Sequence, residues 1–252
     1  MGKWKRIVRS LIRYGEADFD QGYLEWGFHK EERQRKELEF LLRALKPPSG
    51  ASILDMGCGQ GHHAVWLAER GLQVTAYDIS PTFLKEAKRF ASEAGVSVSW
   101  LQCSHEDADF PEGTFDAAYA LESFAPEKPL LQKVARWLKP GGLFLKDIIN
   151  AEYFARKGMY ESWKEGPEGV FKLERHRVKD PQGGPTDYWI TIDMDKGEIL
   201  EETLTAGKGL SVDEVRERAA GAALRLEKSY GNLDGGPIDK DTRRIYLVFR
   251  RS

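Results

Sequence analysis

Short apolar runs alternate with helical patterns from Ala51 to Ile149, and this alternation limits the fold more than any other feature of the chain. Helical patterns cover about His62–Arg70 and Pro81–Ala94, and a third ends near Leu138. Strands that alternate with helices pair in parallel through right-handed crossovers. The pattern therefore predicts one open, doubly wound α/β sheet. Its first strands are predicted at Ser52–Met56, Gln73–Tyr77, Val96–Leu101, Phe115–Leu121 and Leu143–Ile149.

The chain changes character after Ile149. Three β-rich runs follow, separated by DPQGGP and DKG: GVFKLERHRV, DYWITIDM and EILEETLT. Short runs with turn signals between them predict an antiparallel β insertion. A helix that begins at Ser211 and two last strands, about Leu224–Tyr230 and Arg244–Phe249, return the chain to the far edge of the sheet. The predicted fold is a mostly parallel, seven-stranded α/β sheet with a small antiparallel insertion.

The expected organisation has four parts. They are N-terminal helices at 1–46, a cofactor-binding core at 47–150, an antiparallel β cap at 151–209 and the C-terminal part of the core sheet at 210–252. The insertion either covers an acceptor pocket or only protects the edge of the sheet. In the opening KWKRIVRSLIRY, apolar residues fall on one helical stripe between basic residues. Such a basic amphipathic helix docks onto its own domain or lies on an anionic membrane.

Composition and charge exclude several classes of partner and location. With 38 basic and 40 acidic side chains the formal net charge is −2, so no overall field favours a polyanion such as DNA. Cys58 and Cys103 are too few for a disulfide scaffold and form no C-x-x-C pair. The apolar runs are far shorter than a bilayer span, and no signal peptide is evident. We therefore expect a cytoplasmic protein without nucleic acid or a stably inserted membrane segment.

The stretch ILDMGCGQGHH, residues 53–63, joins the first strand of the sheet to the first helix, where open α/β sheets bind ligands. A dinucleotide fingerprint, G-x-G-x-x-G, would need a third glycine at His62, and a P-loop would need G-K-S or G-K-T. Both phosphate-binding patterns are therefore incomplete. A nucleoside with an amino-acid tail is the alternative, because glycines allow close approach and the helix N-terminus favours a carboxylate.

Three features in order carry a family resemblance. DMGCGQG, the acid Asp78 at the end of the second strand and LKPGG before the fifth strand together resemble a class I S-adenosylmethionine-dependent methyltransferase. The resemblance covers roughly residues 30 to 150. DIINAEYF and YGNLDGGPIDKDTRRIYLVFRR resemble a small-molecule subset of these enzymes with an antiparallel insertion. The resemblance implies a Rossmann-like methyltransferase fold and S-adenosyl-L-methionine as cofactor.

The resemblance also implies which residues bind the cofactor. Asp78 would accept from both ribose hydroxyls, and Ile79 would lie against the adenine. Ser104 stands where the family usually has an aspartate for the adenine amino group, so His105 or Glu106 could supply that contact instead. Tyr23 either closes over the cofactor or belongs to the core. The residues expected at the methionine end of the cofactor are Asp55, Gly57, Cys58 and Gly59. The residues expected to face the sulfonium and the acceptor are Leu121, Glu122 and Ser123.

The implied reaction is direct methyl transfer to a small-molecule acceptor. A hydroxyl or carbon acid would need a base, for which Glu122 and His176 are the candidates, whereas an amine could need none. His176 is otherwise a solvated strand residue. No sequence cluster has metal-ligand spacing, so no metal is expected. Two other functions stay open: a nicotinamide-dependent oxidoreductase, and a protein that binds the cofactor without turnover.

Overall fold

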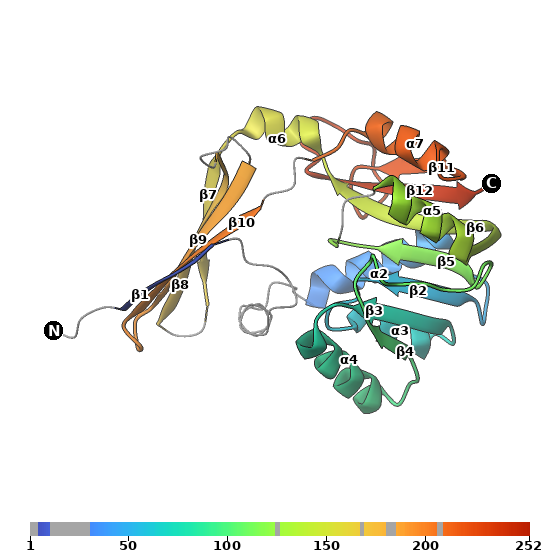
Figure 1. The fold of residues 1–252 in the computed structure, drawn as a ribbon, viewed down its shortest axis with the longest axis horizontal. Coiled ribbons are helices and arrows are strands. Elements are labelled where there is room, and N and C mark those ends of the chain that lie inside the picture. Colours follow the sequence, from blue (N-terminus) through green and yellow to red (C-terminus); the bar gives the residue numbers. More distant parts are fainter. Residues whose placement is uncertain (1–4, 11–30, 124–126, 167–168, 180–184, 206–208) are drawn as a thin grey trace. The chain divides into compact units, whose positions relative to one another are not determined.

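The computed structural model describes residues 5–10, 31–123, 127–166, 169–179, 185–205 and 209–252. The chain forms two compact units, each containing one sheet (Figure 1). The first unit, which we call the β unit, combines Met1–Phe28 with Phe154–Lys208. The second, which we call the core unit, combines His29–Tyr153 with Gly209–Ser252.

The core unit contains a seven-stranded sheet in the order β11-β12-β6-β5-β2-β3-β4. All neighbouring strands pair in parallel except at β12, which is antiparallel to both β6 and β11. This confirms the predicted mostly parallel, seven-stranded α/β fold. In chain order the strands are β2 (Ser52–Met56), β3 (Gln73–Asp78), β4 (Ser99–Gln102), β5 (Phe115–Ala120), β6 (Leu138–Ile149), β11 (Leu224–Tyr230) and β12 (Arg244–Arg251).

Helices cover both faces of this sheet (Figure 1). On one face lie α2 (Glu31–Leu45), α3 (His62–Glu69) and α4 (Pro81–Ala94). On the other lie α5 (Lys128–Trp137) and α7 (Val212–Ala220). Each face has its own apolar core, represented by Leu41 and Trp66 on the first and by Trp137 and Val215 on the second, all under 5% exposed. The double layer explains why the central strands read as apolar runs.

Local sequence signals set the helix ends. The Ser80 side chain accepts from Phe83 N at the start of α4, and Gly95 ends that helix in the left-handed conformation. The predicted helix after Ser211 is α7, and Ser211 and Glu214 form a capping box at its start. Two strand starts differ from the prediction by three residues or more: β4 begins at Ser99, and β6 already begins at Leu138, so KPGG belongs to the strand.

The β unit contains a five-stranded sheet in the order β1-β10-β9-β8-β7. The predicted antiparallel runs appear as β8 (Val170–Lys179), β9 (Pro185–Asp193) and β10 (Glu198–Thr205), and β7 (Tyr160–Glu165) is an additional strand. A short helix, α6 (Ala151–Lys157), connects β6 to this sheet. Phe171 pairs with Ile192 and Leu173 with Ile190, so these apolar residues share one face, as expected from their alternation.

The prediction of an amphipathic helix at the N-terminus is wrong for the residues that the structure describes. Lys5–Ser10 form β1, a strand parallel to β10. Lys5 and Arg6 pair there with Glu198 and Glu201, at 3.0 and 2.6 Å. The expected division at residue 46 also differs from the observed units, because α2 belongs to the core unit while residues 1–28 belong to the β unit.

The order of the core sheet locates its ligand-binding edge. Successive strands add outward on opposite sides of β2 and β5, so the topological switch point lies between these two strands. In open α/β sheets, ligands bind beyond the carboxyl ends of strands at such a point. The residues at this edge are the ends of β2, β3, β5 and β6, together with the start of antiparallel β12, where Arg244 pairs with Ile149.

Candidate active site

The chain turns from β2 into α3 through residues 57–61, which we call the glycine loop. Gly57, Gly59 and Gly61 have φ angles of 74°, 53° and 74°, a conformation that favours glycine. The amides of Gly57 and Cys58 both donate to Tyr77 O of β3, at 2.9 and 3.0 Å. These bonds hold the loop against the end of the neighbouring strand.

Close packing also requires glycine at two of these positions. A Cβ on Gly57 would lie 2.9 Å from Ser123 Cβ. A Cβ on Gly61 would lie 2.6 Å from Trp100 Cη2 and 2.7 Å from Ala87 Cβ. Gly61 therefore permits close packing of helix and sheet, the role of the third glycine in a dinucleotide fingerprint, although it stands one position earlier.

Asp78 lies at the carboxyl end of β3, beside the glycine loop. Its Oδ2 accepts from Gly59 N at 2.8 Å, and its Oδ1 accepts from Ser80 N at 2.9 Å. These contacts orient the carboxylate, and each carboxylate oxygen can accept more than one hydrogen bond. The next side chain, Ile79, is 47% exposed. A carboxylate and an exposed apolar side chain thus lie side by side at the ligand-binding edge.

Asp55 and Cys58 are buried around the start of the loop. Burial raises the pKa of Asp55 to about 6, although the Tyr119 hydroxyl and the charge of His63 oppose this rise. No described group lies in hydrogen-bonding geometry with Asp55 Oδ2. Burial and the nearby charge of Asp55 also raise the pKa of the Cys58 thiol well above its usual value. Cys58 is therefore a neutral thiol at physiological pH rather than a nucleophile.

The residues after β4 form a turn. Ser104 Oγ donates to Asp107 Oδ2 at 2.7 Å and accepts from Asp107 N at 3.1 Å, so this hydroxyl already serves the turn. Glu106 is exposed, and its carbonyl accepts from Lys133 Nζ. The sequence predicted contacts to the adenine edge from Ser104, His105 or Glu106, and this prediction stays untested.

The His105 side chain lies between Tyr77 and the glycine loop. Its Nδ1 lies 3.0 Å from Tyr77 Oη, and its Cε1 lies 3.5 Å from the Cβ position of Gly57. Burial and the charge of Lys146 lower the pKa of His105 to about 4, so the ring is neutral at physiological pH. A contact from His105 to the cofactor would therefore fall at the end of the cofactor assigned to Gly57, not at the adenine.

The end of β5 leads into residues 121–123, which we call the β5 turn. Glu122 has a φ of 51°, in the left-handed region that non-glycine residues rarely occupy. Its amide donates to Asp147 Oδ1 at 2.9 Å. Its carboxylate pairs with Arg33 and, at 3.4 Å, with Arg244. Leu121 packs against the apolar core, whereas Ser123 is exposed and faces Gly57.

Sequence reasoning missed the ion pairs around Glu122. Lys146 Nζ donates to Asp147 Oδ1 at 2.8 Å, and Arg244 pairs with Asp147 Oδ2. Burial alone would raise the pKa of Asp147, but the charges of Lys146 and Arg244 lower it to about 2. Two adjacent charged residues within the apolar run LFLKDII were the available signal. Their partners could not be inferred, because Arg33 and Arg244 are distant in sequence.

The structure does not support His176 as a general base. Burial alone would lower the pKa of His176, but hydrogen bonds to Asp187 and Glu174, both at 3.3 Å, raise it to about 9. The imidazole is therefore protonated at neutral pH and has no basic lone pair to offer. His176 belongs to the β unit, where its ring stacks on Tyr160 at 4.5 Å between centroids. The other predicted contact from outside the core sheet, Tyr23, lies outside the described residues.

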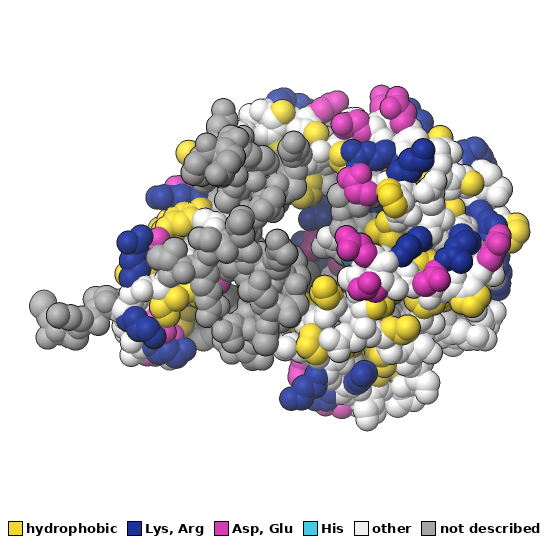
Figure 2. Space-filling view, viewed as in Figure 1, with side chains coloured by type: hydrophobic (Ala, Val, Ile, Leu, Met, Phe, Trp, Pro, Cys, Tyr) yellow, Lys and Arg dark blue, Asp and Glu magenta, His cyan; other side chains and the backbone are white. Residues whose placement is uncertain are grey.

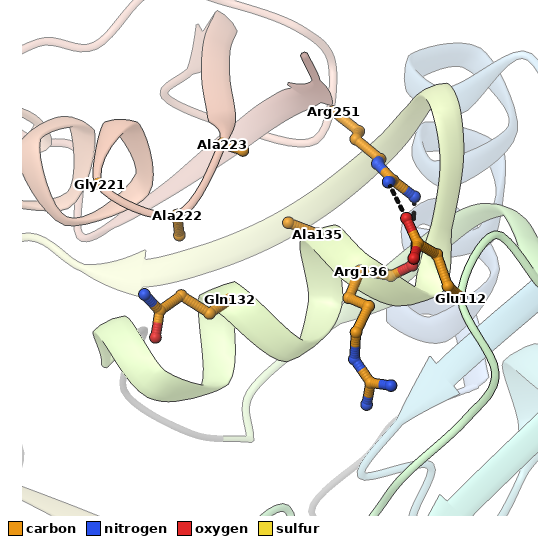
Figure 3. Close-up of a pocket in the computed structure, with 8 residues that line it drawn as sticks. All are labelled: Glu112, Gln132, Ala135, Arg136, Gly221, Ala222, Ala223 and Arg251. Atoms are coloured by element: carbon orange, nitrogen blue, oxygen red, sulfur yellow. Dashed lines mark hydrogen bonds and ion pairs between the residues drawn. The ribbon is translucent and has the colours of Figure 1, made fainter.

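A depression of about 350 Å³ lies away from this site (Figure 3). It is bordered by the C-terminal part of α5, the connection from α7 to β11 and Arg251 at the end of β12. Arg251 is engaged there with Glu112, at 2.6 Å, and with the carbonyl of Leu138 at the start of β6. The depression is thus at the amino ends of β5 and β6, opposite the glycine loop.

The described residues contain no group of three or more His, Cys, Asp or Glu side chains that could hold a metal ion. None of their helices is long and apolar enough to cross a membrane.

Residues 53–142, from β2 to KPGG, match the family described as "Methyltransferase domain". The S-adenosyl-L-methionine-dependent Diels-Alderase iccD of Talaromyces variabilis is 34% identical over 209 residues, which cover 78% of this chain and 68% of that protein. This chain belongs to the S-adenosylmethionine-dependent methyltransferase family. The family is thereby assigned on sequence similarity that extends well beyond the glycine loop.

Two further relatives agree with this family. The ubiquinone biosynthesis O-methyltransferase of Xanthomonas axonopodis pv. citri (strain 306) is 37% identical over 135 residues, 47% of this chain. The chain spans only 56% of that enzyme's length. Among solved structures, the CcbJ methyltransferase of Streptomyces caelestis superposes with a TM-score of 0.71 at 18% identity, over 90% of this chain and 94% of its own. This last similarity shows the family fold alone.

The residues present fit the family's cofactor, S-adenosyl-L-methionine. Asp78 would accept from the ribose diol, and exposed Ile79 would offer an apolar surface to the adenine. The glycine loop allows the close approach that an amino-acid tail needs, and buried Asp55 would provide an anion for that tail. Gly57, Cys58 and Gly59 stay assigned to the methionine end as a prediction.

Proposed function

We propose that this protein transfers a methyl group from S-adenosyl-L-methionine directly to a small-molecule acceptor. The observation that carries the proposal is Asp78, bound to the glycine loop through Gly59 N at 2.8 Å. This bond connects the expected ribose-binding carboxylate directly to the loop. Residues 53–142, which contain both, match a methyltransferase domain. A nicotinamide-dependent oxidoreductase is not favoured.

The chemistry depends mainly on positioning. When bound, the cofactor supplies an electrophilic methyl group on a sulfonium. The protein then has to orient the acceptor in line and exclude water, effects worth up to about 7–11 kcal/mol in favourable cases. The β5 turn is the proposed acceptor side of the site, since its Ser123 packs against Gly57. The neutral imidazole of His105, also beside Gly57, places no additional positive charge near the sulfonium.

The acceptor atom decides whether a base is required. Glu122 remains the candidate for an acceptor that must lose a proton. Because its carboxylate is shared by Arg33 and Arg244, accepting a proton would mean giving up these ion pairs. An amine, which can react through its own lone pair, needs no such exchange. The arrangement therefore supports an amine or an easily ionised hydroxyl more than a carbon acid.

A small molecule is the proposed partner, and nucleic acid is not. The formal net charge is −2, and on the face drawn in Figure 2 basic and acidic side chains are interspersed over the core unit. Polyanion binding instead requires a surface of one sign. We further propose a cytoplasmic location, which fits two free cysteines, Cys58 and Cys103. Cell fractionation with an antibody to the protein tests that location.

The insertion is proposed to serve acceptor binding and water exclusion. Both of its ends attach to the ligand-binding edge of the core sheet: Leu210 N donates to Ile149 O at 2.9 Å, and Ala151 N donates to Leu210 O at 3.4 Å. A segment that leaves and returns at this edge is well placed in the chain to vary acceptor choice without altering the cofactor site. This is the functional meaning we give to the expected cap.

Turnover of the cofactor tests the proposed function. The protein is incubated with S-adenosyl-L-methionine labelled in the methyl group and with a panel of phenols, catechols and amines. Formation of S-adenosylhomocysteine and a labelled product is expected for at least one acceptor class. A folded Asp78→Ala protein is the matched control and should lose this activity. Tight cofactor binding without transfer to any acceptor would instead favour a protein that binds the cofactor without turnover.

A second function has its own support. The relative with 78% coverage of this chain is named a Diels-Alderase, and it resembles this chain beyond the methyltransferase domain. We therefore propose, as the second candidate, a cofactor-dependent cycloaddition in which no methyl group is transferred. The discriminating measurement uses a polyene substrate with a diene and a dienophile. Cyclised product without S-adenosylhomocysteine would identify this function, and stoichiometric S-adenosylhomocysteine would exclude it.

A further inference from the structure

The β5 turn contains a backbone conformation that needs support. Glu122, with a φ of 51°, is a bulky residue in the left-handed region, which L-residues adopt at an energetic cost. Such conformations persist where surrounding contacts hold them, and they cluster at functional sites. Glu122 lies at the carboxyl end of β5, next to the switch point of the sheet.

Two consecutive residues of β6 hold the backbone on both sides of the turn. Lys146 Nζ donates to Ala120 O at 3.2 Å, and Asp147 Oδ1 accepts from Glu122 N at 2.9 Å. Lys146 and Asp147 are 2% exposed and pair with each other at 2.8 Å. Charged side chains this deeply buried are held in a single arrangement, because a lost partner would leave an unpaired buried charge.

Two arginines from other elements hold the Glu122 side chain. Arg244, at the start of β12, binds Asp147 Oδ2 and lies 3.4 Å from Glu122 Oε1. Arg33, from α2, binds Glu122 and also Glu37 Oε1, the latter at 3.0 Å. The turn is therefore held through both its backbone and its side chain by contacts from α2, β6 and β12.

The β5 turn also contacts the glycine loop. Ser123 Cβ lies only 2.9 Å from the position that a Cβ on Gly57 would take, so the two backbones approach closely. A rotation of Glu122 out of the left-handed region would redirect the chain at Ser123. It would thereby remove this contact with the loop to which the cofactor is expected to bind.

We propose that Lys146, Asp147 and Arg244 are positioning residues that hold Glu122 in its left-handed conformation and so keep Ser123 packed on the glycine loop before the cofactor arrives. This role rests on the proposed cofactor site. A binding-competent loop that is only partly populated weakens apparent affinity by its fractional population. The ion pairs would thus contribute to cofactor affinity without touching the cofactor.

A rescue experiment tests this role by isothermal titration calorimetry with S-adenosylhomocysteine. Arg244→Gln removes the ion pairs of Arg244 with Glu122 and Asp147 and should weaken binding of S-adenosylhomocysteine roughly three- to tenfold. Adding Glu122→Gly should restore the affinity to within about twofold of the original, because glycine adopts the left-handed conformation unaided. If Arg244→Gln does not fold, Asp147→Asn with and without Glu122→Gly is measured instead, with circular dichroism as the test of folding.

Two matched controls separate positioning from general stability. Arg250, on the same strand as Arg244, pairs with Glu227 at 2.7 Å, and Arg250→Gln should leave the affinity unchanged. Ala223 is also left-handed, with a φ of 57°, outside this network. Ala223→Gly should stabilise the fold in the Arg244→Gln background without restoring affinity.

Three results would overturn the inference. The first is an unchanged affinity in a folded Arg244→Gln protein, and the second is a weakened affinity that Glu122→Gly does not restore. The third is that Ala223→Gly restores the affinity of the Arg244→Gln protein as fully as Glu122→Gly does. In that case the ion pairs would only stabilise the fold. Failure of the unaltered protein to bind S-adenosylhomocysteine is a different result, because it would remove the proposed function together with this inference.

Discussion

At the scale of single residues, Asp78 connects the glycine loop to the proposed ribose site. Its two backbone contacts fix the carboxylate, so a diol would meet an acceptor already in place. Asp78→Ala should weaken binding of S-adenosyl-L-methionine and S-adenosylhomocysteine by roughly 1.5–3 kcal/mol, the worth of hydrogen bonds to a charged group. Calorimetry measures this, with NAD as a ligand for which no binding is expected. Unchanged affinity in the folded variant would falsify the ribose assignment.

Ser104→Ala should weaken cofactor binding less than Asp78→Ala does. Its hydroxyl already bonds to Asp107, so losing an adenine contact should cost about 0.5–1.5 kcal/mol of cofactor affinity. A loss equal to that of Asp78→Ala would mean that Ser104 is a principal contact, whereas no loss would move the contact to Glu106 or the backbone.

Asp55 predicts a pH dependence of cofactor binding. Burial raises its pKa to about 6, so the free protein binds a proton there below that pH. If the carboxylate pairs with the cofactor's ammonium group, only the ionised form binds well. Affinity should then rise as the pH increases from 5 to 7, by roughly tenfold, and level off above. Calorimetry at several pH values measures this, and a profile that Asp55→Asn leaves unaltered would contradict the pairing.

The residues that could be predicted from sequence are those whose signal is local. The glycine loop and Asp78 stand next to strand ends that hydrophobic patterning locates, so their neighbourhood followed from the α/β alternation. Arg33 and Arg244 reach Glu122 from 89 and 122 residues away, and nothing in their own surroundings marks them. The raised pKa of His176 could not be predicted for the same reason, since Asp187, which contributes to it, comes from another strand.

At the scale of elements, β1 shows where a periodic pattern misleads. An apolar stripe interrupted by basic residues fits a helix, but Ile7 and Val8 are β-branched and favour a strand where a partner strand is present. The partner is β10, whose Glu198 and Glu201 pair with Lys5 and Arg6. Tertiary pairing, which the sequence pattern does not contain, therefore decided the conformation.

The start of α3 gives a prediction on packing. Gly61→Ala combines a left-handed φ with contacts of 2.6 and 2.7 Å to Trp100 and Ala87, and should reduce the free energy of unfolding by about 2–4 kcal/mol. Gly71→Ala is the control: its φ is 78°, but no described atom lies within 4 Å of the added Cβ. It should cost only about 1–2 kcal/mol. Equal losses in chemical denaturation would show that packing at Gly61 adds nothing.

The sheet of the β unit should lose stability at alkaline pH through His176. Its pKa is raised to about 9 from an ordinary value near 6.5, so the stabilisation is fully present below pH 6.5 and is lost as the pH rises through 9. We expect a loss on the order of 2 kcal/mol across this range. Urea unfolding of the protein and of His176→Gln, at pH 6 and pH 9.5, measures it. A protein and variant with the same pH dependence would refute the contribution.

At the scale of the whole molecule, the antiparallel insertion and the N-terminal residues together form a second unit. Residues 1–28 join residues 154–208, because β1 pairs with β10. The family match covers residues 53–142, which lie within the core unit, and the Diels-Alderase relative matches 78% of the chain. In the β unit, the antiparallel strands β8, β9 and β10 were predictable from the alternation of apolar and polar residues. Strand β1 of the same sheet was not, because it comes from the opposite end of the chain.

This division predicts that cofactor binding and acceptor use can be separated. Leu210 N bonds to Ile149 O at 2.9 Å, so a short Gly/Ser linker can join Tyr153 to Gly209. A shortened chain without 1–28 and 154–208 should keep cofactor affinity within a few-fold, since the glycine loop and Asp78 remain, and should lose methyl transfer. Tyr23→Ala in the full chain shows separately whether removing 1–28 affects the cofactor. Methyl transfer that persists in the shortened chain would exclude the β unit from acceptor binding and leave the core unit as the complete enzyme.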